Sequence, residues 1–283
     1  MLRLHEPAAR SADGEAIPFP GGILLVAPHM DDETLGCGAL LAGFRWAGSV
    51  HIVFATDGAR SPQQGSDHSP ASSELPLIRR REALEAMAVL GIAEDHVHFL
   101  DLPDAELCRH TARLRDKLHE LVERLCPAWL LVPFRYDRHP DHLAVNRVAT
   151  RIVCEHRARR LSLVEYFVYS KWRLLSSGDV RTYLLSDRVV RIRPSEAMSV
   201  KKQQALACYR SQTTLFYPWQ RRPILTSTLR NRVCTEPEVF VVHEPASFER
   251  AVFARSRAWI PVAHRIEPVL KRGKDRLVEW LVS

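Results

Sequence analysis

Two short segments of the sequence concentrate side chains that can bind a metal ion. His29–Asp32 holds one imidazole and two carboxylates, and His139–His142 holds two imidazoles and one carboxylate. Two nitrogens and one oxygen leave the fourth position of a tetrahedral zinc site open, which is the arrangement of catalytic rather than structural sites. Either segment alone is a weak signal, because an isolated histidine is commonly structural and an aspartate at a helix start is commonly a cap. Together the two segments predict a metal site.

Alternating strand and helix patterns bring both segments to the same edge of a predicted sheet. Apolar runs predict strands over Ile23–Ala27, His51–Ala55, Val97–Leu100 and Trp129–Val132. Helical periodicity predicts helices over Thr34–Trp46, Arg79–Leu90, Cys108–Leu125 and Leu143–His156. This alternation indicates an α/β fold, Rossmann-like, with a mostly parallel sheet and helices on both faces. Polar or ionisable residues follow each of these strands, and sites in such sheets lie beyond the carboxyl ends of the strands.

From Ser162 onward the pattern changes and predicts a cap region. Strands are expected over Val164–Val168, Thr182–Leu185, Val189–Ile192 and Val239–Val242, and a helix over Ser195–Arg210. The second and third of these strands are expected to form a hairpin across Ser186–Asp187. We expect a single domain over residues 1–283, with a catalytic α/β core over residues 22–160 and a cap with a C-terminal extension over residues 161–283.

Two further segments stand apart from the predicted core. Gly58–Pro76 is rich in Ser, Pro, Gly and Gln, and a loop of that length in a compact domain is typical of a lid or of disorder. Ile266–Val282 has the mixture of apolar and basic residues found in amphipathic helices. We expect that helix to pack its apolar face on the domain rather than on an anionic membrane.

Composition and charge limit the compartment and the partners. The chain has 283 residues and a net charge of +7, which suits an anionic small molecule such as a phosphorylated sugar or a nucleotide sugar. Without a zinc finger, an aromatic RNA-binding signature or a long basic run, nucleic acid is not an expected partner. No apolar stretch has the length of a membrane span or the pattern of a signal peptide, so a cytoplasmic location is expected. The six cysteines form no Cys-x-x-Cys pair and are expected to be reduced and buried.

The first histidine segment belongs to a longer stretch, Ala27–Gly38, that resembles the first signature of the PIG-L/LmbE family of zinc-dependent N-acetylglucosaminyl deacetylases. His139–His142 is similar to the second signature of that family, and the Thr56–Gly58 turn, the helix start at Arg79–Ala83 and Tyr209–Gln212 also resemble family features. The resemblance covers roughly Gly22 to Gln212. One departure is Met30, where the family usually has proline, and we expect it to alter the stiffness of the turn rather than the chemistry.

The resemblance implies roles for individual residues. The implied ligands of a zinc ion, which Fe²⁺ could replace at such an open site, are His29, Asp32 and His142. Asp31 would act as the general base, although a residue next to a zinc ligand can also serve only to orient that ligand. His139 would be a cation that stabilises the oxyanion or protonates the leaving amine, and Asp141 would orient His139 and raise its pKa.

Amide hydrolysis requires these residue types independently of any resemblance. Zinc lowers the pKa of its bound water from about 15.7 toward roughly 7 and polarises the carbonyl. A carboxylate then accepts a proton from the water, and an acid protonates the departing nitrogen. Arg79 and Asp57 are candidate substrate-binding residues, with a solvated helix end and a turn-stabilising carboxylate as their respective structural alternatives.

The predicted function is hydrolysis of the N-acetyl or other N-acyl group of an amino sugar or its conjugate. Such a conjugate could be an N-acetylglucosamine-containing glycoside, a nucleotide sugar or a lipid-linked sugar. The alternatives are a zinc amidase for a non-sugar amide, a doubly wound nucleotide-binding module and a non-catalytic binding protein. The first strand–helix turn carries acids in place of a glycine-rich loop, which argues against pyrophosphate binding. The sequence does not define the oligomeric state.

Overall fold

The computed structural model of the chain describes residue 19 and residues 21–43, 50–62, 74–156, 161–169, 179–185 and 188–243. The strands are β1 (Ile23–Ala27), β2 (Val50–Thr56), β3 (Val97–Leu102), β4 (Trp129–Pro133), β5 (Ser162–Tyr166), β6 (Val189–Ile192) and β7 (Glu238–His243). The α-helices are α1 (Asp32–Gly43), α2 (Leu75–Leu90), α3 (Thr111–Leu125), α4 (Pro140–Glu155), α5 (Glu196–Cys208), α6 (Arg210–Thr213) and α7 (Ser227–Thr235). Short 3₁₀ helices are η1 (Glu94–His96), η2 (Leu107–Arg109) and η4 (Val180–Tyr183).

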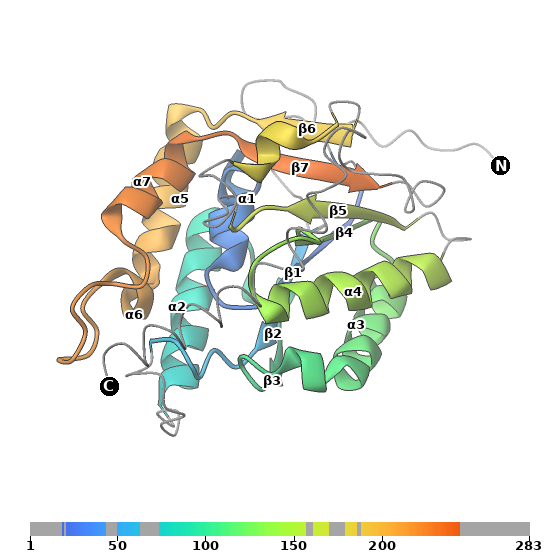
Figure 1. Cartoon of the computed structure of the whole chain (residues 1–283), viewed down its shortest axis with the longest axis horizontal. Coiled ribbons are helices and arrows are strands. Elements are labelled where there is room, and N and C mark those ends of the chain that lie inside the picture. The colour runs from blue at the N-terminus through green and yellow to red at the C-terminus, as the bar shows by residue number, and fades with distance from the viewer. Residues whose placement is uncertain are drawn as a thin grey trace, which may run out of the picture.

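The described strands form one sheet in the order β3-β2-β1-β4-β5-β7-β6 (Figure 1). β1 pairs in parallel with β2 and β4, and β3 and β5 extend the parallel part on either side. All residues of β1 are buried, which explains its continuous apolar run, because helices cover both faces of a parallel sheet. The predicted α/β class with a mostly parallel sheet is therefore confirmed.

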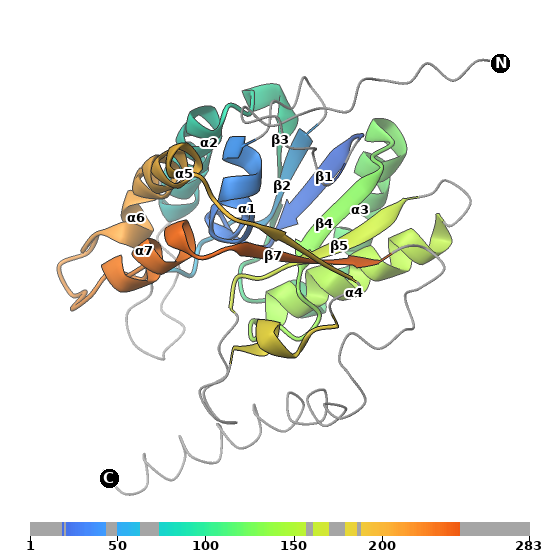
Figure 2. The same ribbon diagram turned by 90° about the horizontal axis from the view of Figure 1, so that it is seen from above.

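Helices cover both faces of this sheet (Figure 2). α1, α2 and α5 lie on one face, where their apolar side chains share a core with Leu25 and Phe54. α3 and α4 lie on the other face and share a second core with Val26 and Leu130. Successive side chains of a strand point to opposite faces, so the neighbours Leu25 and Val26 belong to different cores.

Residues 162–243 extend the same sheet and do not only cap it. β5 joins β4 in parallel, and β7 pairs antiparallel with both β5 and β6. The predicted hairpin across Ser186–Asp187 is wrong, because η4 replaces its expected first strand and β6 pairs with the distant β7. A short alternating segment fits a strand and a turn about equally well, and only the long-range pairing distinguishes them. The boundary between a core and a cap near residue 160 stays a prediction.

Three helices begin earlier than predicted: α2 starts at Leu75 rather than Arg79, and the other two begin beside the candidate site. α1 starts at Asp32 rather than Thr34, and α4 starts at Pro140 rather than Leu143. Proline is favoured at the first helical position, where its missing N–H would have no helical partner. The N-cap of α4 is His139, whose side chain accepts the N–H of Asp141. The second histidine segment is thereby the first turn of a helix.

Some predictions lie outside the described residues or are only partly correct. Residues 63–73 of the predicted lid and the amphipathic segment 266–282 are not described. Within the described chain, every helix is too short or too polar to cross a membrane. The six cysteines are free, but burial is complete only for Cys37 and Cys234, and the expectation that all are buried is wrong.

A buried charge cluster fastens the loop after β4 to the sheet. Glu165 on β5 is fully buried, and its Oε1 accepts hydrogen bonds from the Arg135 N–H (3.1 Å) and the Asn146 side chain (2.8 Å). Its Oε2 lies 2.7 Å from Nε2 of His243 on β7. Burial alone would raise the pKa of Glu165, but Arg135 and His243 outweigh it and lower that pKa to about 2. The ionised carboxylate therefore anchors the segment that carries His139 and His142.

A close contact between α1 and β5 holds the other half of the site. The ring of Tyr166 on β5 packs on Gly36 of α1, and the Tyr166 hydroxyl donates a hydrogen bond to the Val26 carbonyl at 2.9 Å. A Cβ on Gly36 would overlap that ring, with the Tyr166 Cε2 atom only 2.9 Å away. Both ring and backbone are buried and have little freedom to move. Glycine thus allows α1 to approach the sheet at this point.

We expect Gly36→Ala to lower the free energy of unfolding by about 1–3 kcal/mol, the usual cost of overpacking a core. Gly43→Ala is the matched control on the same helix, because its new methyl group would meet only the flexible end of Met198. Alanine favours a helix over glycine by about 1 kcal/mol, so the control should be neutral or stabilising. Urea unfolding of both variants measures the difference in their free energies of unfolding. Equal stabilities would show that the Tyr166 ring moves aside at little cost.

Candidate metal centre and catalytic site

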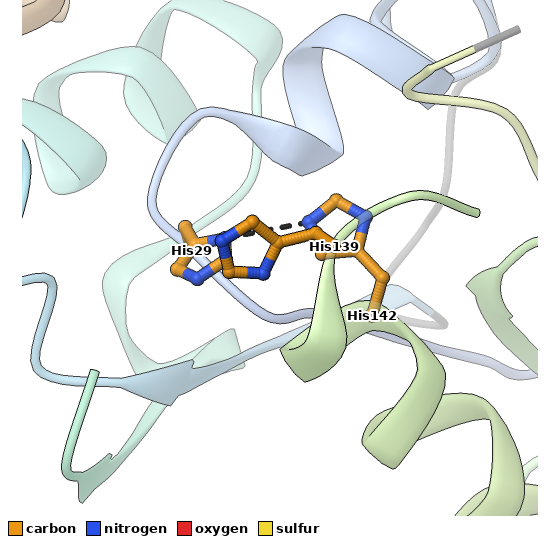
Figure 3. A group of neighbouring side chains, drawn as sticks. All are labelled: His29, His139 and His142. Carbon is orange, nitrogen blue, oxygen red and sulfur yellow. Dashed lines mark hydrogen bonds between the residues drawn. The ribbon is translucent and has the colours of Figure 1, made fainter. Parts of the chain in front are cut away.

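The two histidine segments meet at the carboxyl end of the sheet (Figure 3). His29 follows β1, Asp32 begins α1 and His142 lies in the first turn of α4. The Asp32 Oδ2 atom lies 3.0 Å from His29 Nδ1 and 3.1 Å from His142 Nε2. The two ring nitrogens are 3.4 Å from each other. Three potential ligand atoms from distant parts of the sequence therefore face one point.

The spacing of these atoms fits a tetrahedral divalent metal ion. Zinc bonds of about 2.0–2.1 Å place neighbouring ligand atoms about 3.3–3.4 Å apart. The observed separations of 3.0, 3.1 and 3.4 Å are within a few tenths of an ångström of that value. His139 could form an alternative set with His29 and His142, since their ring nitrogens also lie within 4.8 Å. That set would omit the carboxylate that lies between both imidazoles.

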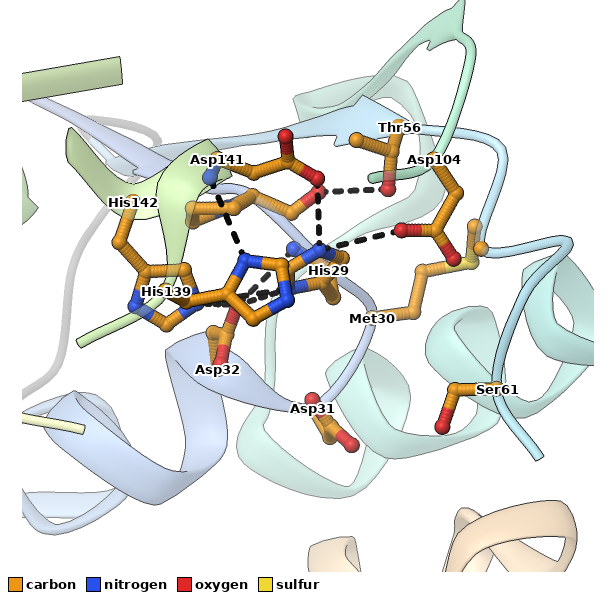
Figure 4. A network of polar contacts seen from close by, with 12 residues as sticks. His29, Met30, Asp31, Asp32, Thr56, Ser61, Asp104, His139, Asp141 and His142 are labelled. Carbon is orange, nitrogen blue, oxygen red and sulfur yellow. Dashed lines mark hydrogen bonds and ion pairs between the residues drawn. The ribbon is translucent and has the colours of Figure 1, made fainter. Parts of the chain in front are cut away.

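Further carboxylates surround the two imidazoles (Figure 4). His29 Nε2 lies 3.2 Å from oxygens of both Asp104 and Asp141, and His142 Nδ1 lies 3.1 Å from Asp137 Oδ1. Burial opposes a charge on either ring, but the carboxylates outweigh it. They raise the pKa of His29 well above its usual value and that of His142 to about 9. A pocket this rich in buried negative charge favours a bound cation.

These outer carboxylates also define which ring nitrogen is available. A metal-binding histidine usually donates its other N–H to a carboxylate or carbonyl, which orients the ring and strengthens it as a ligand. In His29, Nε2 faces Asp104 and Nδ1 faces Asp32. In His142, Nδ1 faces Asp137 and Nε2 faces Asp32. Both rings therefore direct a nitrogen toward the same point.

Asp31 lies beside the proposed ligands with a strained backbone. Its φ of 143° is unusual for any residue other than glycine, and such strain clusters at functional sites. Arg79 supports the turn, because its Nη2 donates to the Met30 carbonyl at 2.5 Å and lies 3.5 Å from Asp31 Oδ2. Burial, assisted by Asp32 and opposed by Arg79, raises the pKa of Asp31 to about 8. The Asp31 carboxyl group is thus held at the site and is easily protonated.

His139 and Asp141 are both at the site, but not as the expected pair. The Asp141 carboxylate accepts hydrogen bonds from the N–H groups of Ala105 and Leu107 and contacts His29. The contact of His139 with Asp141 is to its backbone, where the ring Nδ1 accepts the N–H at 3.3 Å. Asp141 favours the charged form of His139, yet burial and the neighbouring rings of His29 and His142 prevail and lower its pKa to about 4. The cationic role of His139 stays a prediction, and this lowered pKa argues against it.

The site opens into a cavity of about 260 Å³. Its wall consists of His29, Asp31, Asp32, Arg60, Ser61, Arg79, Asp104, Ala105, His139, Tyr169, Gln212, Ile224 and Leu225. Arg79 was expected to bind substrate, and it lines the cavity, but only 1% of its surface is exposed. Asp57 was expected there as well. Its carboxylate instead accepts the N–H groups of Ala59 and Asp104, so in the described structure it braces two loops behind the wall.

Two of the carboxylates that hold the imidazoles, Asp104 and Asp137, were not predicted as site residues. Asp104 follows β3 and Asp137 follows β4, so both belong to the polar groups noted at strand ends. Position alone did not separate them from ordinary loop residues. Tyr169 was not predicted, and it carries no local signal at all. Gln212 was noted only as part of the Tyr209–Gln212 segment without a role, and it lines the cavity from α6.

Comparison with known proteins places this chain among deacetylases. The family described as PIG-L, GlcNAc-PI de-N-acetylase, matches residues 24–153, which include both histidine segments. The chain is 29% identical over 133 residues to a probable N-acetyl-α-D-glucosaminyl L-malate deacetylase 2 of Bacillus subtilis, a match that covers 46% of this chain and 59% of that relative. It is 30% identical over 143 residues to the uncharacterized deacetylase YaiS of Escherichia coli, which covers 47% and 68% respectively.

Structural similarity extends further along the chain than sequence similarity. N,N′-diacetylchitobiose deacetylase from Pyrococcus horikoshii superposes with a TM-score of 0.58 at 20% identity. The superposition covers 83% of this chain and 88% of that protein. At this identity the likeness supports the fold, including the strands of the second half.

We expect Asp137→Asn to weaken metal binding at His142 by about 10–100-fold, the usual effect of removing a group that orients a ligand. The asparagine Oδ1 atom can still accept the N–H groups of Arg138 and His139 and face His142 Nδ1, so the variant mainly removes the negative charge beside that ring. After removal of metal with a chelator, the metal concentration that restores half of the enzymatic turnover should rise by that factor. Asp116→Asn on the exposed face of α3 is the control. An unchanged concentration would show that Asp137 does not support the ligand.

Proposed function

The chain belongs to the PIG-L family of de-N-acetylases, and on that premise we propose that it is a metal-dependent hydrolase of N-acetylated amino sugars or their conjugates. The observation that carries the proposal is the convergence of His29, Asp32 and His142 on one point, with His29 and Asp32 in the wall of a cavity. We propose these residues as ligands of a zinc ion, with Fe²⁺ as a possible substitute. When bound there, the metal would act as a Lewis acid that polarises the amide carbonyl and acidifies the attacking water.

Asp31 is the proposed general base. Its carboxyl group lines the cavity beside Asp32, and its Oδ2 atom lies 3.5 Å from Arg79 Nη2. Its high pKa suits a group that must accept a proton from water and then release it to the departing amine. The Arg79 guanidinium lies beside the Asp31 carboxyl group and donates a hydrogen bond to the Met30 carbonyl in the same turn. We therefore propose Arg79 as a positioning residue. Direct contact of Arg79 with the sugar is a weaker proposal, since its side chain is almost completely covered.

His139 is the proposed hydrogen-bond donor to the developing oxyanion. Because Nδ1 accepts the Asp141 N–H, the neutral ring carries its proton on Nε2. A neutral donor in a buried site can stabilise an oxyanion without the desolvation cost of a second cation beside the metal. The lowered pKa of His139 supports this role rather than that of an imidazolium. Asp141 supports catalysis through His29 in this scheme.

The cavity wall supports a sugar-sized polar substrate. Polar groups of Arg60, Ser61, Tyr169 and Gln212 also line the cavity. Several hydroxyl groups of a pyranose ring could form hydrogen bonds with such a wall. The relatives named as glucosaminyl deacetylases support an N-acetylglucosamine unit as the group that enters. The aglycone, the native metal and a cytoplasmic location are further parts of this proposal.

Release of acetate from a set of N-acetylglucosamine derivatives tests the proposed activity. We expect metal-dependent release from at least one of the free, nucleotide-linked and lipid-linked sugars, and none after chelation. N-Acetylated amino acids serve as non-sugar amides. If the protein hydrolysed those amides faster than every sugar tested, the proposed function would change from sugar deacetylase to general amidase.

Asp31→Asn is the matched catalytic control for that assay. The amide is nearly isosteric but cannot accept a proton at neutral pH, so turnover should fall roughly 10²–10⁴-fold. The metal content should stay at the wild-type level, because Asp31 is not a proposed ligand. Turnover near the wild-type rate would assign the base to another group.

We expect His139→Asn to lower kcat by about 10²–10³-fold, the usual loss on removal of one oxyanion donor. Asparagine is a good N-cap, so the start of α4 should be preserved while the imidazole N–H is lost. KM and metal content should change little. A large loss of metal in this variant would instead identify His139 as a ligand and favour the alternative set with His29 and His142.

A further inference from the structure

A second group of metal-binding side chains lies at the far ends of α3 and α4. His119 and Glu123 are four residues apart on α3, so they share one face of that helix. His156 is the C-cap of α4, which packs beside α3 on the same face of the sheet (Figure 1). One ligand atom from each of the three side chains lies within 4.8 Å of the other two.

The hydrogen bonds of His156 direct one nitrogen toward this group. Its Nδ1 lies 2.8 Å from the Ile152 carbonyl, which can only accept, so Nδ1 carries a proton. The neutral ring then presents the lone pair of Nε2, and that atom is 2.6 Å from Glu123 Oε1. Two acceptor atoms so close together require a proton or a cation between or beside them. An Nδ1–H bonded to a backbone carbonyl is also the usual support of a metal-binding histidine.

His119 distinguishes these two possibilities. A proton on His156 would satisfy only the pair with Glu123 and would place an imidazolium next to the imidazole ring of His119, whose centroid is 5.0 Å away. A metal ion would use all three groups, with two nitrogens and one oxygen as ligands. Burial also suits a partly closed site, since His156 is 8% exposed and Glu123 is 38% exposed.

We propose that His119, Glu123 and His156 form a second site for a divalent transition metal ion, with Zn²⁺ as the best match to the donor set. His156 is fourteen residues beyond His142 on α4, so the two sites are about 21 Å apart along the helix. The second ion would join the C-terminal ends of α3 and α4 and would contribute to stability rather than to hydrolysis. This proposal does not depend on the proposed function of the first site.

Equilibrium dialysis against about 10 μM free Zn²⁺ measures the metal stoichiometry and tests the second site. A specific site with a dissociation constant well below that concentration would be nearly filled. Wild-type protein should bind about two ions per chain, and His119→Gln about one. His29→Ala should also bind about one, and the double variant His29→Ala/His119→Gln almost none. Glu120→Ala, an exposed neighbour on α3, should retain both ions. His119→Gln should keep wild-type turnover, because the residue is remote from the cavity.

Thermal unfolding provides a readout that does not involve activity. In the His29→Ala background, saturating Zn²⁺ should raise Tm, and His119→Gln should abolish that rise. Wild-type binding of a single ion, an unchanged stoichiometry in His119→Gln, or binding only at millimolar Zn²⁺ would each overturn the second site. The proposal of the first site would be overturned separately if His29→Ala bound as many ions as the wild-type protein.

Discussion

The proposed metal centre depends on the concentration of buried negative charge around two imidazole rings. Asp32, Asp104, Asp137 and Asp141 are all at least 95% buried and lie within 3.2 Å of His29 or His142. Carboxylates so close together and so poorly hydrated repel one another unless a cation is present. The apolar strands can hold them only because each lies in a loop or a first helical turn beyond the carboxyl end of a strand. The fold and the chemistry are thus linked by electrostatics rather than by shape alone.

Much of this arrangement was accessible from the sequence. The parallel part of the sheet follows from apolar runs separated by helices, because each buried strand must be hydrophobic on both faces. The meeting of His29 and His142 follows from the same reasoning, since carboxyl ends of adjacent parallel strands share one edge. β1 and β4 are neighbours in the sheet, and this adjacency is the one fact needed to place the two histidines together.

The errors arose where a distant contact decides the local outcome. Asp141 is two residues from His139 in sequence, yet its carboxylate bonds to the loop after β3 and to His29. The strand expected near Thr182 is a 3₁₀ helix, and β7, from far along the chain, takes the place beside β5 in the sheet. Asp57 illustrates the same limit, since its bond to Asp104 depends on the pairing of β2 with β3. Local patterns do not contain these pairings.

The left-handed backbone at Asp31 has a consequence for the evolution of this protein. A conformation with φ of 143° costs a non-glycine residue on the order of 1–3 kcal/mol, and a buried carboxyl next to Asp32 and Glu33 adds to that cost. Glycine at this position would relieve both, so the most stable sequence for this turn differs from the one the chain carries. On the proposed role of Asp31 as general base, the acid at this position exchanges stability for activity.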